Sequence, residues 1–200
     1  DSRRLMGPNL FSQREGAALD IHCRDDEAPS LLLAWRTAVR LLAARLGWER
    51  PEVYARPYPG GGHAFLAAPI DALLTATEVN EQAFAIAEAI VEGRPAPDRR
   101  DVVARLKVHL QHESNRALVV WQQAARALGV TFTFDDDAVS VGGGTGSLTF
   151  PLRAIPEPSA IDWSTVHDIP VALVTGSNGK TTTTRLLAAM LHEAGHVAGL

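Results

Sequence analysis

A mixed α/β fold is predicted for this chain, because apolar residues recur along it with two different spacings. Between Leu32 and Leu46 they return every three or four residues, which is the spacing of one face of a helix. In shorter runs such as residues 17–23 they lie between turn-forming residues, as is typical of strands. Near the C-terminus an apolar run at 171–175 breaks at glycines and leads into a helical stretch that opens on Lys180. Alternating strands and helices therefore account for most of the chain.

The first elements are a strand, a turn and a return strand. The strand begins near Arg4 and enters a turn at Gly7, Pro8 and Asn9, and residues 17–23 form its return. A helix follows, whose single apolar stripe consists of Leu32, Trp35, Val39, Leu42 and Leu46. Gly47 is expected to end it. Residues 57–62 are predicted to be a loop before a short strand at 63–67.

Three further helices are predicted in the middle of the chain. Thr75 and Glu78 have the spacing of a capping box, and the helix beyond them is expected to end at Gly93. A stiff connector at 94–98 leads to a helix, and another begins at Ser114 or Asn115 and ends at Gly129. The expected buried positions on these three helices are Val79, Ala83, Ile86, Ile90, Val103, Leu106, Leu110, Leu118, Trp121, Ala125 and Leu128.

Three strands and a domain boundary are predicted next. Residues 131–134 and 138–141 have the pattern of a hairpin, and a third strand at 148–150 follows a glycine-rich connection. Prolines at 151, 156 and 158 mark the end of an N-terminal α+β region, residues 1–158, and 159–200 form a linker and the beginning of a second domain. Because the chain begins at Asp1 without a methionine and stops soon after its last helix, we expect it to be a piece of a larger protein.

Composition excludes several classes of function. The net charge of −4 gives no basic footprint, so we expect no nucleic-acid partner. No apolar run approaches the roughly 20 residues that span a bilayer, and no signal-peptide pattern opens the chain, so the expected location is cytoplasmic, with no membrane partner. The single cysteine, Cys23, cannot form an intrachain disulfide and is assigned a packing role.

The residues from Thr175 to Thr182 have the pattern of a phosphate-binding loop. Gly176 and Gly179 allow backbone N–H groups to approach phosphate oxygens, and Ser177 and Asn178 shape the turn between them. The following helix offers its free amides to the same anion. Lys180 would neutralise the distal phosphates as the catalytic cation, the hydroxyl of Thr181 would ligate Mg²⁺, and Thr182 would add a further donor. The expected ligands are ATP and Mg²⁺.

The spacing of this loop differs from that of the general P-loop, which needs a glycine where this chain has Val174. The run from Thr175 to Thr182 instead resembles the loop of the Mur ligase family, which includes peptidoglycan-building amino-acid ligases, folylpolyglutamate synthases and cyanophycin synthetases. The resemblance implies a truncated, parallel-sheet ATP-binding domain. It also implies an ATP-dependent ligase that phosphorylates a carboxylate and joins it to an amine, with small-molecule or peptide substrates.

A second resemblance concerns the N-terminal region. Residues 5–12 look like the start of cyanophycin synthetases, and residues 124–130 with 139–144 are similar to the helix and hairpin that introduce the ATP-grasp domain of that family. This chain departs from the pattern, because only a few dozen residues separate the hairpin from the Gly176 loop, which is too short for an ATP-grasp domain. The resemblance therefore implies a ligase with one ATP site.

Other interpretations of the same residues stay open. The loop is also compatible with another P-loop NTPase or kinase, or with a module that binds ATP without turnover and recruits a polymer. His109 and His112 beside Glu113 could bind a metal, but a solvated helix end is the preferred interpretation. Residues 142–146 lack a following lysine and helix, which favours a mobile connection, and Asp135, Asp136 and Asp137 are interpreted as a turn. The oligomeric state is not predicted.

Overall fold

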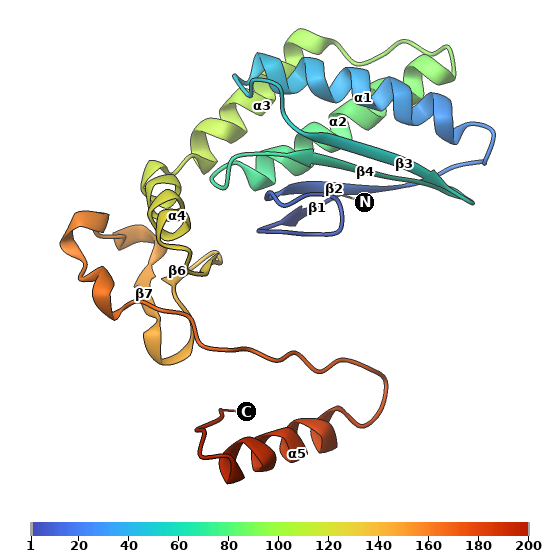
Figure 1. Cartoon of the computed structure of the whole chain (residues 1–200). Coiled ribbons are helices and arrows are strands. Elements are labelled where there is room, and N and C mark those ends of the chain that lie inside the picture. Colours follow the sequence, from blue (N-terminus) through green and yellow to red (C-terminus); the bar gives the residue numbers. More distant parts are fainter. Residues whose placement is uncertain (1, 200) are drawn as a thin grey trace.

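Four strands near the N-terminus form one antiparallel sheet in the order β1-β2-β4-β3. Their bounds are β1 (Ser2–Leu5), β2 (Gly16–His22), β3 (Val53–Tyr58) and β4 (Gly61–Ala67). The computed structural model describes residues 2–199 (Figure 1). The predicted first strand, turn and return strand are confirmed, with Arg4 paired to Ala17.

Two long helices, α1 (Ala28–Arg45) and α2 (Leu73–Val91), cover one face of this sheet (Figure 1). Alternate residues of β2 point toward them, because side chains on a strand alternate between faces. The core that results contains the buried residues Leu19, Trp35, Val39, Leu66, Val79 and Ile86. The predicted apolar stripe of the first helix is thus confirmed, and Gly47 follows it with a φ of 83°.

Helix α3 (Arg99–Glu113) packs against α2, and its buried residues Val102 and Leu106 belong to the same core. A smaller layer follows, built from α4 (Arg116–Leu128), β5 (Phe132–Phe134), β6 (Ala138–Val141) and β7 (Leu148–Pro151), with short 3₁₀ helices at Gly144–Gly146, Leu152–Ala154, Pro158–Ala160 and Trp163–Thr165. Strands β5, β6 and β7 form an antiparallel sheet in chain order, as predicted. The predicted ends of α4 are also confirmed, since Asn115 caps it and Gly129 ends it in the left-handed conformation.

A buried tryptophan organises the smaller layer. Trp121 of α4 is fully buried and its ring lies 5.0 Å from Phe150 and 5.3 Å from Trp163, measured between ring centroids. Its indole N–H donates to the carbonyl of Pro156 at 2.5 Å. An ion pair of 2.5 Å joins Arg126 to the buried carboxylate of Glu15, so the smaller layer is tied to the N-terminal sheet.

Three predictions about the N-terminal elements were wrong. Of the predicted loop at 57–62, residues 57–58 belong to strand β3 and residues 61–62 to strand β4. Pro57 is tolerated in β3 because β3 is an edge strand, where a missing N–H breaks no ladder. Thr75 does not cap α2, which begins at Leu73. Ile90 and Leu128, expected to be buried, are both about half exposed because they lie in the last turns of their helices.

The glycine-rich connection between β6 and β7 is not the mobile loop that was predicted. The N–H of Gly143 donates to the carbonyl of His167 at 3.0 Å, and the N–H of His167 returns to Gly146 at 3.2 Å. A Cβ on Gly142 would lie 2.4 Å from the carbonyl oxygen of Gly146. The glycines are therefore needed so that residues 166–169 can pack against this connection.

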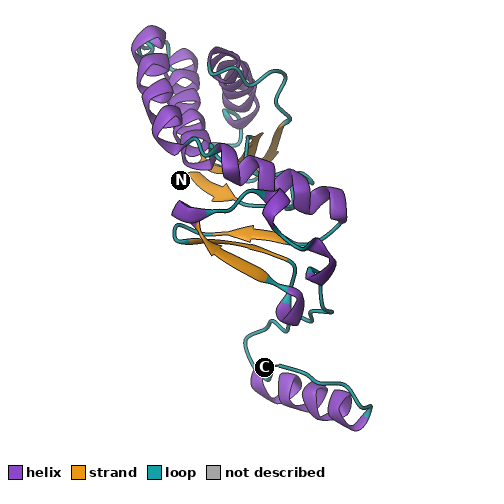
Figure 2. Cartoon of the chain, turned by 90° about the vertical axis from the view of Figure 1, so that its left-hand side faces the viewer, coloured by secondary structure: helices purple, strands orange, loops and turns teal. Residues whose placement is uncertain are grey.

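Beyond residue 169 the chain leaves both layers. Figures 1 and 2 show an extended segment that leads to α5 (Lys180–Glu193), which stands apart from the other elements in both views. The predicted strand at 171–175 is absent from the described residues, and the side chains of Val171 and Leu173 are 73% and 93% exposed. A strand needs a neighbour for its backbone hydrogen bonds, and no strand of the described residues lies beside this run.

Candidate functional site

The turn before α5 has the backbone geometry that its glycines predict. Gly176 has a φ of 135° and Gly179 a φ of 78°, both in the region that side chains disfavour. A Cβ at Gly179 would meet no atom within 4 Å, so the conformation, and not crowding, is what requires glycine there. These two residues turn the chain from the extended segment directly into the helix.

The N-terminal end of α5 is open to an anion. Gly179 is its N-cap residue and offers no side-chain acceptor, and its first turn contains no acidic residue. The first N–H groups of a helix have no partner within it, and they carry the positive end of the helix dipole. The helical ladder begins with the N–H of Thr183, which donates to the carbonyl of Gly179 at 2.9 Å. The preceding amides are thus placed to bind a phosphate or carboxylate.

The side chain of Lys180 lies across the turn. Its ammonium donates to the carbonyl oxygen of Gly176 at 2.5 Å and is exposed to solvent. This contact holds the positive charge on the same side of the loop as Gly176. The cation and the helix amides therefore flank one small region of space, which suits a multiply charged anion.

The threonines after Lys180 differ in what their hydroxyls do. The hydroxyl of Thr184 donates to the carbonyls of Lys180 at 3.0 Å and Thr181 at 3.1 Å, so it is used within the helix. Thr181 and Thr182 are exposed, and within residues 2–199 no hydrogen bond of their hydroxyls is observed. Their oxygens fit the chemistry of a magnesium ligand and of a phosphate donor, respectively.

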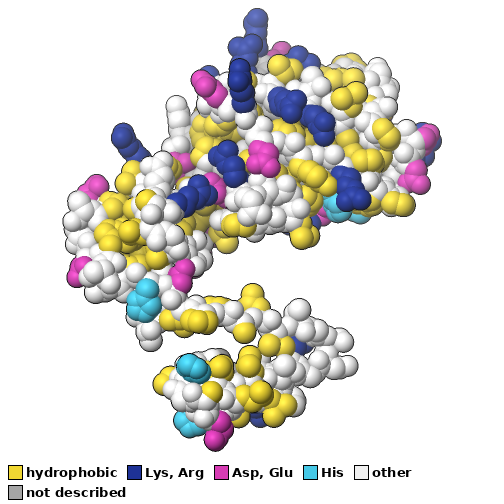
Figure 3. All heavy atoms as spheres, in the orientation of Figure 1, with side chains coloured by type: hydrophobic (Ala, Val, Ile, Leu, Met, Phe, Trp, Pro, Cys, Tyr) yellow, Lys and Arg dark blue, Asp and Glu magenta, His cyan; other side chains and the backbone are white. Residues whose placement is uncertain are grey.

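The surroundings of this loop are apolar and uncovered. Leu186 and Met190 of α5 are 60% and 69% exposed, and the space-filling view in Figure 3 shows hydrophobic side chains on the surface of the detached segment. Within the described part of the chain, no residue of α5 is buried. The loop can therefore hold an anion, but the described residues build no walls around it.

Two of the other sequence candidates, Glu113 and Asp135, have structural partners. Glu113 accepts hydrogen bonds from α2 rather than facing a metal with His109 and His112, which are both exposed. The predicted turn at 135–137 is confirmed, because the Asp135 carboxylate accepts from the amides of Asp137 and Ala138, which lowers the pKa of Asp135. Among residues 2–199, no group of three or more His, Cys, Asp and Glu side chains could bind a metal ion.

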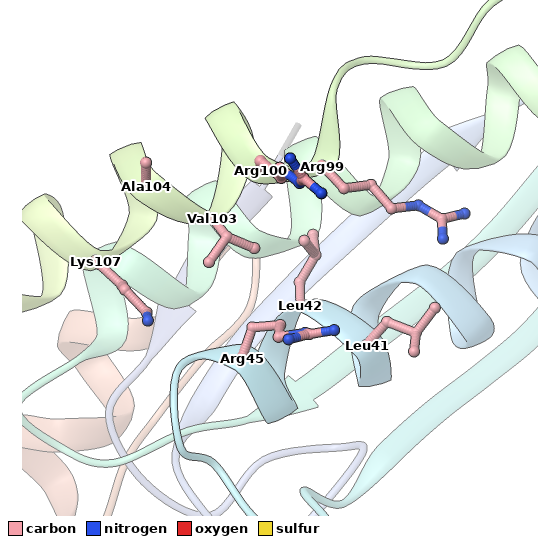
Figure 4. A pocket seen from close by; sticks show the side chains of 8 residues that line it. All are labelled: Leu41, Leu42, Arg45, Arg99, Arg100, Val103, Ala104 and Lys107. Carbon is pink, nitrogen blue, oxygen red and sulfur yellow. The ribbon is translucent and has the colours of Figure 1, made fainter.

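A cavity between two helices was missed by the sequence analysis. It has a volume of about 550 Å³ and lies between the end of α1 and the beginning of α3 (Figure 4). Its lining consists of Leu41, Leu42, Arg45, Arg99, Arg100, Val103, Ala104 and Lys107. The adjacent arginines at the start of a helix, followed by Lys107 two turns later, were the sequence signal for it.

The helices of residues 2–199 include none with the length and apolar character that a membrane crossing requires.

Comparison with known proteins places one part of the chain. Residues 174–200, which include the loop and α5, match the model of the Mur ligase middle domain. The chain is also 61% identical over 33 residues to the UDP-N-acetylmuramoylalanine--D-glutamate ligase of Synechococcus elongatus and, to the same extent, to that of a second Synechococcus strain. Each aligned stretch covers 16% of this chain and 7% of the relative's length. These matches support a likeness to the Mur ligase family; the likeness of the N-terminal region to cyanophycin synthetases stays a prediction.

Proposed function

We propose that residues 176–182 bind the phosphates of ATP in a Mur-type ligase, which joins a carboxylate to an amine as an amide. The observation that carries the proposal is the coincidence of two features on the same residues. The open helix end, with its glycine turn and Lys180, has the chemistry of an anion site, and the Mur ligase middle domain match covers the same segment. The substrates are a small-molecule or peptide carboxylate and an amine.

Each loop residue has a role in this proposal. Gly176, Ser177, Asn178 and Gly179 shape the turn so that backbone amides face the phosphates. Lys180 offsets the charge on the transferring phosphoryl group. The hydroxyl of Thr181 is one ligand of Mg²⁺, and Thr182 donates to a phosphate oxygen.

The proposed reaction has two steps. ATP supplies a phosphoryl group to the substrate carboxylate, which turns a poor leaving oxygen into a good one and releases ADP. The amine then attacks the acyl carbon, the C–N bond forms, the C–O bond to the phosphate breaks, and the nitrogen loses one proton to solvent as inorganic phosphate leaves with the carboxylate oxygen. The residues of this chain contribute by holding the phosphates and stabilising their negative charge. Residues 1–158 form a separate N-terminal region in this proposal, and 159–200 belong to the linker and the ATP-binding domain.

The decisive experiment measures the release of ADP from ATP by the protein in the form that its source organism produces. We expect Lys180→Ala to reduce turnover by a hundredfold or more, since removing one preorganised charge or donor at a phosphoryl site costs on the order of 10² to 10³ in rate. The matched control is Arg185→Ala, which removes an exposed cation from the same helix and should leave turnover within about twofold. Equal turnover in both variants would refute the phosphate-binding role.

The proposed magnesium ligand has its own matched pair. Thr181→Ala should raise the Mg²⁺ concentration needed for half-maximal ATP turnover, because it removes an oxygen ligand. Thr183→Ala removes a hydroxyl from the same exposed turn and should leave the Mg²⁺ requirement unchanged. A change of the same size in both variants would contradict the assignment of Thr181.

A further inference from the structure

The cavity between α1 and α3 is lined by basic side chains above an apolar floor. Figure 4 shows Leu42 of α1 and Val103 of α3 pointing toward one another between the two helices, with Arg45 and Lys107 near them. Leu42 is buried, whereas the four cationic side chains around it are exposed. The lining includes no acidic residue.

The four cations have no partner to explain their position. Within the described residues, no ion pair involves Arg45, Arg99, Arg100 or Lys107, although eight ion pairs occur elsewhere. The nearest acids in the sequence are Asp98 and Asp101: Asp98 accepts hydrogen bonds from the amides of Arg100 and Asp101 as the cap of α3, and none of the eight ion pairs includes Asp101.

The placement of the arginines is unfavourable for the fold itself. Arg99 and Arg100 occupy the first two positions of α3, where the positive end of the helix dipole disfavours cations; the acids of the same helix end, Asp98 and Asp101, lie outside the lining of the cavity. Like charges that converge from two helices also repel one another. A bound anion would relieve both effects, which is a reason for these residues to be basic.

The geometry narrows the class of anion. Arg99 and Lys107 are eight positions apart on one helix, so their backbone positions lie about 12 Å apart at a rise of 1.5 Å per residue. A ligand that follows the helix from one of these positions to the other would need roughly four residues of extended chain. The apolar floor of Leu41, Leu42 and Val103 suits a ligand that carries methylene groups between its charges.

We propose that this cavity binds an extended acidic peptide segment, with carboxylates on the four cations and its methylene groups on the leucines. Arginine favours carboxylates because its planar fork can donate two parallel hydrogen bonds. This site is separate from the proposed ATP loop, and its ligand is recognised whether or not that loop binds ATP.

Binding of a fluorescently labelled hexaglutamate peptide to the 200-residue chain tests the proposal. We expect saturable binding with one peptide per chain, which weakens as salt rises from low to physiological strength. The double variant Arg99→Glu, Lys107→Glu should weaken it about tenfold or more. The control double variant Arg14→Glu, Arg153→Glu makes the same change in net charge outside the cavity and should change affinity less than about threefold. Equal weakening by the two double variants would overturn the site, since net charge alone would then explain binding.

Two further probes test the class of ligand. Leu41→Ser should weaken the peptide but leave inorganic tripolyphosphate unaffected, because only the peptide has methylene groups to bury. If tripolyphosphate or a single-stranded oligonucleotide displaces the peptide at a lower concentration than unlabelled hexaglutamate, the assignment to an acidic peptide is wrong. All substituted side chains are exposed, so every variant should give the circular dichroism spectrum of the unmodified chain. A loss of binding in a variant with that spectrum then reports on the site and not on unfolding.

Discussion

The clearest prediction about stability concerns a helix cap that comes from a distant residue. The first turn of α2 has no cap of its own, because its N-cap residue is Ala72. The Glu113 carboxylate of α3 takes that place: it accepts from the amide of Leu74 at 2.6 Å and from the amide and hydroxyl of Thr75, both at 2.7 Å. Glu113→Ala removes all three hydrogen bonds at once.

The expected loss is about 2 to 3 kcal/mol of unfolding free energy. Removing a side-chain cap costs about 0.5–2 kcal/mol, and a buried polar group left unsatisfied costs about 1–3 kcal/mol. Thr75 is only 1% exposed, so water cannot replace the partner of its hydroxyl without local rearrangement. Because Glu113 is partly exposed, the expected loss of unfolding free energy is smaller than the sum of the upper limits for the lost cap and for the unsatisfied polar group.

Urea unfolding followed by circular dichroism measures this loss. Glu113→Gln keeps one carbonyl acceptor and should fall between the unmodified protein and Glu113→Ala. Glu81→Ala, which removes an exposed carboxylate from α2 itself, should stay within about 0.5 kcal/mol of the unmodified protein. A loss for Glu113→Ala no larger than that of Glu81→Ala would refute the view that α3 caps α2.

Two other predictions concern the glycine connection and the pH dependence of stability. Gly142→Ala and Gly129→Ala both place a side chain at a φ near 70°, but only Gly142→Ala puts its Cβ against a backbone oxygen, that of Gly146, at 2.4 Å. In urea unfolding, Gly142→Ala should therefore lose about 1–3 kcal/mol more unfolding free energy than Gly129→Ala. Equal losses would mean that residue 142 does not lie this close to the carbonyl of Gly146. Burial raises the pKa of Asp71 above its ordinary value of 3.8, so its contribution to stability is full below that pH and is lost as the pH rises through the folded-state value. Asp71→Asn should therefore flatten the pH dependence of the urea midpoint above pH 3.8, and the exposed Asp101→Asn should not.

The parts of the structure that sequence reasoning predicted correctly depend on neighbouring residues. Asn115 caps α4 through an amide three residues away, and Gly129 ends the same helix by its own left-handed conformation. The turn at Gly176 and Gly179 belongs to the same group. Such features require only what lies within one turn of the chain, so the residue types and their spacing were enough.

Tertiary structure decided the features whose partners are far away in the sequence. Glu113 and Thr75 are 38 positions apart, so no local pattern could show that one caps the helix of the other. Pro57 became part of a strand because β3 lies at a sheet edge, and the run at 171–175 formed none because no described strand lies beside it. The basic cavity likewise needed the end of α1 to meet the start of α3. In each of these cases the outcome depended on which segments the fold brought together, and hydrogen-bond and charge partners across such distances leave no periodic signal in a sequence.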